Sequence, residues 1–222
     1  MKNKLVIITG TNKGLGMHLL IELLAINHLK ILCLSRKKIE LYEHPSIIYY
    51  PIDFAEPNDF SFLENLITDY SEVLFINNAG TIEPIALVGS LLQEDVKSAI
   101  SVNLTSPILI INEILRISSN KKVTIVNITS GAASRIIVGW SVYSIGKLGL
   151  KSFLSHLSAQ CEENVNVLNI DPGTVDTGMQ EAIQRASVSK FPDVQKFRDF
   201  KKKNMLREPK VVAREIIGSL KF

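Results

Sequence analysis

The stretch Lys4-Leu5-Val6-Ile7-Ile8-Thr9-Gly10-Thr11-Asn12-Lys13-Gly14-Leu15-Gly16 decides the fold. An apolar run that is typical of a buried strand meets a Gly-x-x-x-Gly-x-Gly turn, and the periodic apolar residues over 15–27 predict a helix after it. In such a unit the glycines let the backbone approach a pyrophosphate, and the helix N-terminus presents free N–H groups and a positive dipole end. We therefore expect a dinucleotide site at Gly10, Asn12, Lys13, Gly14, Leu15 and Gly16.

Working outward, apolar runs alternate with segments of helical periodicity along the chain. This alternation predicts one α/β domain over 1–222, with a parallel sheet covered by helices on both faces. The expected strands are 5–9, 30–35, 47–52, 73–77, 123–129 and 165–170. The expected helices are 14–27, 57–70, 93–103, 106–119, 141–162 and 209–220, with at most a turn or two over 36–46 and a less regular segment over 175–204.

Composition excludes several classes of protein. The 222 residues are 46% hydrophobic and carry a net charge of +3, far less basic than a dedicated nucleic-acid binder. Cys33 and Cys161 are isolated, which favours reduced thiols in the cytoplasm, and no metal-ligand spacing occurs. The apolar stretch Ser106 to Leu115 is shorter than the ~20 residues that a membrane span needs. We expect a soluble cytoplasmic protein with no metal, nucleic-acid or membrane partner.

Tyr143 and Lys147 stand four residues apart in an expected helix, which places both side chains on one face. A cation near a phenol lowers its pKa, so such a pair can move a proton near neutral pH. Ser130 follows an expected strand and precedes Gly131, where its hydroxyl can meet the pair. Many helices contain Tyr-x-x-x-Lys by chance, but the three groups together indicate a site that reduces a carbonyl.

Five motifs in order resemble the short-chain dehydrogenase/reductase family over essentially the whole chain. They are Thr9-Gly10-x-x-x-Gly14-x-Gly16, Asn77-Asn78-Ala79-Gly80, Asn103, the Ser130/Tyr143/Lys147 set and Pro172-Gly173-x-x-x-Thr177. The stretches 76–81, 128–133 and 171–180 most resemble sepiapterin reductases and bacterial benzil reductases. The resemblance implies a Rossmann-type doubly wound sheet. Family members continue into a seventh strand where this chain ends at Phe222, so we expect that strand to be absent or the chain to be truncated.

The resemblance also implies roles for individual residues. Tyr143 would donate the proton, Ser130 would hold the carbonyl oxygen, Lys147 would also bind the nicotinamide ribose, and Asn103 would anchor a relay water. Asn103 could equally be a polar residue that ends a helix. Asp53 would meet the adenine amino group. Further cofactor contacts would come from Ser35, Phe54, Asn78, Ala79, Gly80, Pro172, Gly173, Val175 and Thr177.

The end of the second expected strand predicts which cofactor is used. NAD enzymes tend to carry an acid there, but this chain has Ser35-Arg36-Lys37-Lys38. An Arg fork suits a 2′-phosphate, and Lys13 adds a second cation inside the glycine turn. A solvated basic turn is the ordinary alternative. NADP(H) is therefore the expected cofactor.

The loop between Ser130 and Tyr143 is largely apolar and has to pass near the substrate. Ile137, Val138, Trp140 and Met179 would form a pocket for a flat or aromatic carbonyl compound, unless some of them only close the core or a subunit interface. The leading hypothesis is an NADPH-dependent reductase of a ketone or 1,2-diketone. An alcohol dehydrogenase working in the oxidative direction and a non-catalytic NADP(H) sensor are the alternatives.

The resemblance also predicts the oligomeric state. The helices over 106–119 and 141–162 resemble those that pair into a four-helix bundle across a two-fold axis in this family, which predicts a homodimer.

Overall fold

The computed structural model describes residues 4–160, 163–220 and 222. Its described part contains a six-stranded sheet in the order β3-β2-β1-β4-β5-β6, and every neighbouring pair is parallel. The strands are β1 (Lys4–Thr9), β2 (Leu29–Ser35), β3 (Ile47–Pro51), β4 (Glu72–Asn77), β5 (Lys122–Ile128) and β6 (Val165–Ile170). The order reverses between β1 and β4, which is where doubly wound sheets bind ligands. The predicted fold class is confirmed.

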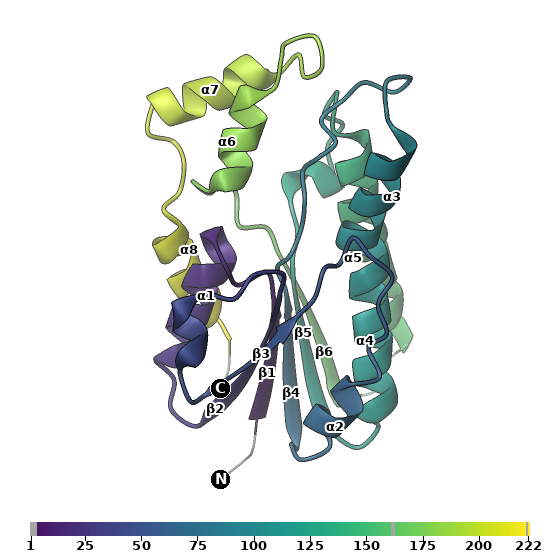
Figure 1. Cartoon of the computed structure of the whole chain (residues 1–222), viewed down its shortest axis with the longest axis vertical. Helices are drawn as coiled ribbons and strands as arrows, with labels where there is room; N and C mark the ends of the chain where they lie inside the picture. Colours follow the sequence, from purple (N-terminus) through teal and green to yellow (C-terminus); the bar gives the residue numbers. More distant parts are fainter. Residues whose placement is uncertain (1–3, 161–162, 221) are drawn as a thin grey trace.

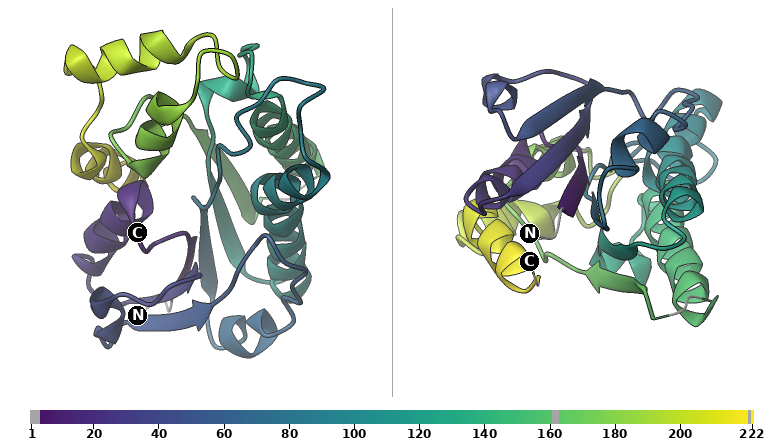
Figure 2. Two further views of the ribbon diagram at one scale, coloured as in Figure 1. Left: turned by 45° about the horizontal axis from the view of Figure 1, so that its top comes forward. Right: turned by 90° about the horizontal axis from the view of Figure 1, so that it is seen from below.

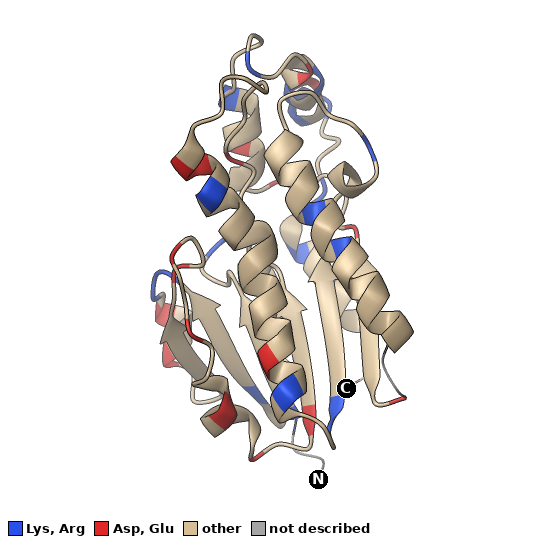
Figure 3. Ribbon diagram, turned by 90° about the vertical axis from the view of Figure 1, so that its right-hand side faces the viewer, with Lys and Arg blue, Asp and Glu red and all other residues tan. Residues whose placement is uncertain are grey.

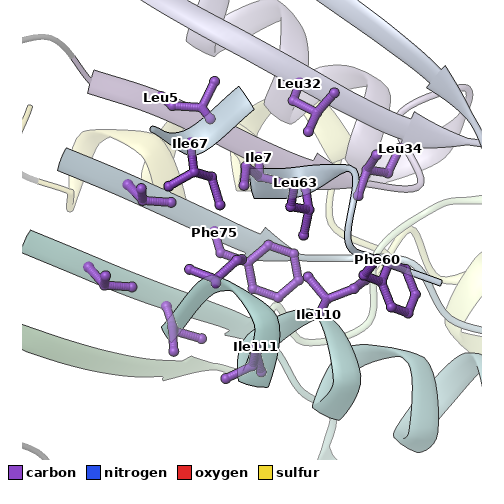
Figure 4. Close-up of a cluster of buried hydrophobic side chains, with 14 of the residues drawn as sticks. Leu5, Ile7, Leu32, Leu34, Phe60, Leu63, Ile67, Phe75, Ile110 and Ile111 are labelled. Carbon is purple, nitrogen blue, oxygen red and sulfur yellow. The ribbon is translucent and has the colours of Figure 1, made fainter. Parts of the chain in front are cut away.

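Side chains of the strands alternate between two cores, one on each face of the sheet. Leu5 and Ile7 of β1 lie in the core shown in Figure 4, together with Phe75 of β4. Val6 and Ile8 point to the other core. Both cores are almost free of solvent, as expected for parallel strands that are covered on both faces.

Helices cover the two faces in two separate groups (Figures 1 and 2). On one face lie α1 (Gly14–Leu24) and α8 (Pro209–Gly218), which pack against each other. On the other lie α2 (Leu63–Ile67), α3 (Gln93–Ile100), α4 (Ser106–Ile117) and α5 (Ser141–Gln160). The C-terminal end of this last helix was expected at residue 162, which lies outside the described residues, as does Cys161.

Three expected helices differ from those observed. The helix expected over 57–70 is reduced to α2, because Asn58 donates to the Asp53 carbonyl and Asp59 accepts from the Ser61 N–H, which fixes a turn. The helices expected over 93–103 and 106–119 are continuous, joined by the π-helical turn η2 (Ser101–Thr105). The short connection over 36–46 holds only the 3₁₀ turn η1 (Glu40–Glu43), as predicted.

The continuous helix Gln93–Ile117 is long and apolar enough, by length and composition alone, to cross a membrane. It has 25 residues, which corrects the expectation that its apolar part is too short. Core helices of soluble proteins pass the same test, and here Ile110, Ile111 and Ile114 pack into the sheet core.

A cap of two helices lies beyond the carboxyl ends of the strands (Figures 1 and 2). It consists of α6 (Gly178–Arg185) and α7 (Val194–Lys202), in the segment that was expected to be less regular. The apolar sides of these helices form a third buried cluster with Trp140 and Tyr143, which includes Ile183, Phe191 and Val194. The cap therefore covers the edge of the sheet where the site is expected.

Candidate active site

The glycine turn after β1 brings two backbone segments into a contact that no side chain could enter. Gly10 has a φ of +71°, and a Cβ atom there would lie 2.9 Å from Cα of Ala79, at the end of β4. A Cβ atom on Gly16 would lie 2.1 Å from the Gly10 carbonyl oxygen. Because Gly10 and Gly16 have no side chains, the N-terminus of α1 faces the crevice directly.

Thr9 and Asn78 hold the turn against the end of β4. The Thr9 hydroxyl accepts hydrogen bonds from the N–H groups of Asn78 at 3.0 Å and Ala79 at 2.9 Å. The Asn78 side chain donates back to the carbonyls of Thr9 at 3.0 Å and Gly10 at 3.2 Å. Thr9 is only 1% exposed, so these bonds are shielded from water. Thr9 was not among the predicted site residues, because its hydrogen-bond partners are 69 and 70 residues away in the sequence.

A cavity of about 670 Å³ extends from the glycine turn to the cap. Every residue predicted to bind the cofactor lines it: Gly10, Asn12, Lys13, Gly14, Leu15, Gly16, Ser35, Arg36, Asp53, Phe54, Asn78, Ala79, Gly80, Tyr143, Lys147, Pro172, Gly173, Val175 and Thr177. The N-cap of α1, Lys13, makes no side-chain cap, and no acid lies in the first turn of the helix. Its free N–H groups and the adjacent cation fit the phosphates of a dinucleotide.

Beyond the ends of β2 and β3, Arg36 lies beside Asp53. The guanidinium nitrogen and the carboxylate oxygen are 3.8 Å apart, and both side chains remain substantially exposed. Asp53 also accepts from the Ala55 N–H. Ser35 lines the cleft, but its hydroxyl is already bonded to Tyr42 at 2.9 Å. The Arg36 guanidinium, which was expected to favour NADP(H), is therefore exposed at the cleft.

Tyr143, Ser130 and Lys147 meet on the wall of the same cavity. Burial raises the pKa of the Tyr143 phenol, the hydrogen-bonding contact with Ser130 lowers it in part, and Asp171 raises it. We expected Lys147 to lower this pKa, and the structure shows a net rise instead. Burial has the opposite effect on Lys147, where it lowers the pKa to about 8. At neutral pH the site therefore holds a protonated phenol.

Asn103 lies behind this group and does not line the cavity. Its side chain donates to the Thr81 carbonyl at 2.8 Å and accepts from the Thr81 N–H at 3.0 Å. Gly80 lies close to both Asn103 and Lys147, since a Cβ atom on Gly80 would lie 3.1 Å from Oδ1 of Asn103 and 3.5 Å from Nζ of Lys147. Lys147 itself donates to the Ile128 carbonyl at 2.9 Å. Asn103 thus anchors the loop that passes beside Lys147.

Arg207 fixes the segment that follows β6, a role that no sequence motif indicates. Its guanidinium donates to the Pro172 carbonyl at 3.2 Å, and its backbone N–H donates to the Thr174 carbonyl at 2.8 Å. The Asp176 N–H in turn donates to the Arg207 carbonyl at 2.9 Å. The Pro172–Gly173 wall of the cavity is thereby tied to the residues just before α8.

Three of the four residues that were predicted to form the substrate pocket line the cavity. Ile137, Trp140 and Met179 line it, but Val138 does not and is 51% exposed. Val138 and Gly139 form a turn, and the Val138 side chain faces solvent while the side chains of Ile137 and Trp140 line the cavity. Phe197 and Phe200 of α7 complete the wall, and they were missed because the sequence did not reveal the cap helices.

Comparison with known proteins identifies the family. Residues 4–187 match the family model described as "short chain dehydrogenase". The chain belongs to the short chain dehydrogenase family. It is 33% identical over 228 residues to a benzil reductase ((S)-benzoin forming) of Bacillus subtilis, with 98% of this chain and 93% of that protein covered. It is 29% identical to sepiapterin reductase of Bos taurus, with 97% and 89% covered.

Solved structures agree with the fold. The crystal structure of the enzyme KRED1-Pglu has a TM-score of 0.85 and 26% identity, covering 95% of this chain and 91% of that one. A short chain dehydrogenase/reductase from Saccharomyces cerevisiae has a TM-score of 0.83 at 22% identity, covering 98% and 92%.

Replacing Thr9 by Val should loosen the crevice, because two N–H groups lose their shared acceptor while the side chain keeps its shape. We expect a loss of ~1–3 kcal/mol in the free energy of unfolding, measured by urea denaturation, and weaker dinucleotide binding. Thr68→Val is the control, since Thr68 is exposed and its hydroxyl bonds only to the Glu64 carbonyl one turn earlier in the chain. Equal stability of the two variants would contradict this account.

Replacing Lys147 by Met should change how stability depends on pH. The folded protein holds this ammonium with a pKa of about 8, below the 10.5 of the unfolded chain. Protonation therefore destabilises the folded state, and the penalty is fully present below pH 8 and vanishes toward pH 10.5. The stability of Lys147→Met relative to the unmodified protein should fall across that window in paired denaturation curves. A difference that does not vary with pH would show that burial does not shift this pKa.

Proposed function

We propose that this short chain dehydrogenase is an NADPH-dependent carbonyl reductase with Tyr143 as the proton donor. One observation carries the proposal: the protonated phenol of Tyr143, the Ser130 hydroxyl and the glycine turn line a single cavity. A dinucleotide held at the turn can thus reach the same space as the proton donor.

The residues of the cavity divide the reaction between them. Bound NADPH supplies the hydride from C4 of its nicotinamide. Ser130 donates a hydrogen bond to the substrate oxygen and holds it beside Tyr143. The Tyr143 hydroxyl transfers its proton to that oxygen as negative charge develops there. Burial keeps the phenol protonated until then, and the neighbouring Lys147 ammonium stabilises the phenolate that remains.

NADPH is proposed over NADH because of the charges at the adenosine end. Arg36 and Lys13 both line the cavity, and both are exposed enough to meet a phosphate. Asp53 lies near enough to orient the Arg36 guanidinium. The cleft thus offers two cations to a 2′-phosphate.

The substrate is proposed to be a ketone or 1,2-diketone attached to a flat ring. The wall beside Tyr143 carries Trp140, Ile137 and Met179, with Phe197 behind them. Such a wall suits a ring. The relatives named benzil reductase and sepiapterin reductase support the same class. A protein that only senses NADP(H) would have no need to keep Ser130 beside Tyr143.

We also propose a homodimer formed through α4 and α5. These helices lie side by side on one face of the molecule, and their outer surface carries few charges (Figure 3). Leu109, Ile145 and Leu148 on that surface are 44%, 55% and 55% exposed. A second copy related by a two-fold axis would cover them.

Replacing Tyr143 by Phe should abolish nearly all reduction of benzil while leaving NADPH affinity within about threefold, because only the acidic proton is lost. Turnover is followed by NADPH absorbance and affinity by fluorescence titration. Tyr50→Phe is the control, since Tyr50 does not line the cavity and its ring stacks on Phe62. Near-normal turnover in Tyr143→Phe would assign the proton to another group.

The unmodified protein should bind NADPH at least tenfold more tightly than NADH, a difference of about 1.4 kcal/mol. Arg36→Asp should shrink or invert this preference. Lys37→Asp provides the control, because Lys37 adjoins Arg36 without lining the cavity. Dissociation constants that are equal for the two cofactors in the unmodified protein would rule out the proposed preference.

Light scattering at micromolar concentration should give about twice the chain mass of 24.7 kDa. Leu148→Glu should reduce it to the monomer, because a charge cannot be buried without a partner there. Ile21→Glu, on the exposed side of α1, should leave the mass unchanged. A monomer of the unmodified protein would refute the dimer.

A further inference from the structure

Arg135 is a cation on the cavity wall that has no partner in the protein. It lines the cavity together with Ser130 and Tyr143, and it forms no ion pair or hydrogen bond with another residue that the structure describes. The other arginines of the chain each have a carboxylate or a carbonyl oxygen as a partner: Arg36, Arg116, Arg185, Arg198, Arg207 and Arg214. The N–H donors of the Arg135 guanidinium are therefore available to a ligand.

The backbone holds this guanidinium close to the catalytic serine. Arg135 follows the 3₁₀ turn η3 (Gly131–Ala133), and its side chain returns to the start of that turn. A Cβ atom on Gly131 would lie 3.0 Å from Cζ and 3.2 Å from Nε of Arg135, and closer still to Nη2. Ser130 directly precedes Gly131, and its hydroxyl is in hydrogen-bonding contact with Tyr143. The cation thus lies against the residue next to the group that holds the substrate oxygen.

The acids of the cavity do not neutralise Arg135. They are Asp53, Glu83, Asp171 and Asp193. Asp53 lies beside Arg36 instead, and Glu83 and Asp171 accept hydrogen bonds from backbone N–H groups at 2.9 Å and 3.0 Å. Within the described part of the chain, none of the four forms an ion pair with Arg135. A negative group of the substrate can therefore take that place.

The chemistry of the two neighbouring groups indicates what the substrate carries. A guanidinium is a planar fork that matches the two oxygens of a carboxylate. In a 2-oxo acid the carboxylate is bonded directly to the reacting carbonyl carbon. Ser130 can then bind the ketone oxygen while Arg135 binds the carboxylate. The apolar side chains of Ile137 and Trp140 on the same wall suit a ring on the other side of the ketone.

We propose that Arg135 determines substrate specificity by binding a carboxylate next to the reacting carbonyl, so that the enzyme reduces aromatic 2-oxo acids. The hydride of NADPH forms the new C–H bond, the Tyr143 proton goes to the oxygen, and the products are a 2-hydroxy acid and NADP⁺. The inference rests on the proposed carbonyl reduction and adds a second recognised group to its substrate.

The test compares phenylglyoxylate with its methyl ester at saturating NADPH. The two compounds share the ring and the ketone and differ in the negative charge. The measured quantity is the ratio of kcat/KM for the acid to kcat/KM for the ester. Arg135→Gln should lower this ratio by about tenfold or more, the effect of one charge-assisted hydrogen bond. Arg135→Lys should give an intermediate ratio, because the charge remains and the fork is lost.

Two variants control for the general effect of removing a positive charge. Lys196 of α7 also lines the cavity, with its Nζ 6.0 Å from the centre of the Phe200 ring. Arg185 of α6 does not line the cavity and pairs with Glu181. Lys196→Gln and Arg185→Gln should each leave the ratio within about twofold of that of the unmodified protein. Thermal unfolding of all variants separates a change of preference from a loss of folded protein.

The remaining outcomes overturn the inference. A fall of less than about fivefold in Arg135→Gln, or an equal fall in Lys196→Gln, would show that Arg135 does not bind the carboxylate. Weaker NADPH binding by Arg135→Gln with an unchanged ratio would assign the guanidinium to the cofactor.

The unmodified protein separates this inference from the proposed function. If it reduces benzil or the ester but not phenylglyoxylate, the role of Arg135 fails and carbonyl reduction stands. If it reduces none of the three compounds, the proposed function fails and this inference fails with it.

Discussion

The close approach of the turn after β1 to the end of β4 is the constraint on which the site depends. It requires Gly10, because a Cβ atom there would lie 2.9 Å from the backbone of Ala79. The buried hydroxyl of Thr9 and the amide of Asn78 then fasten the two segments together. The crevice opens at this point because the strand order reverses between β1 and β4. Every other feature of the cavity is arranged around this contact.

Burial shifts the pKa values of Tyr143 and Lys147 in opposite directions. It raises the pKa of the Tyr143 phenol, which stays protonated as a proton donor requires, and it lowers the pKa of the Lys147 ammonium. A buried ammonium that bonds to one carbonyl lowers the free energy of unfolding. Active sites commonly contain groups that destabilise the fold in this way. The protein thus carries a destabilising group where the reaction needs a cation.

Much of the fold could be predicted from the sequence, because alternation within strands and glycine spacing are local signals. All six strands agree with their predicted ranges to within a residue at either end. The cap helices α6 and α7 were not predicted, since both are short and carry few apolar residues. The roles of Thr9 and Arg207 depend on distant partners, and the exposure of Val138 depends on how its loop turns. Each of these requires the tertiary structure.

The central claim is that a dinucleotide at the glycine turn and a substrate beside Tyr143 share one cavity. Reduction of benzil with NADPH that is fully deuterated at C4 of the nicotinamide tests it most directly. The account predicts benzoin with one deuterium on its carbinol carbon, detected by mass spectrometry and NMR, and a slower rate than with unlabelled NADPH. Benzoin without deuterium at that carbon would contradict the account, as would the absence of any reduced product.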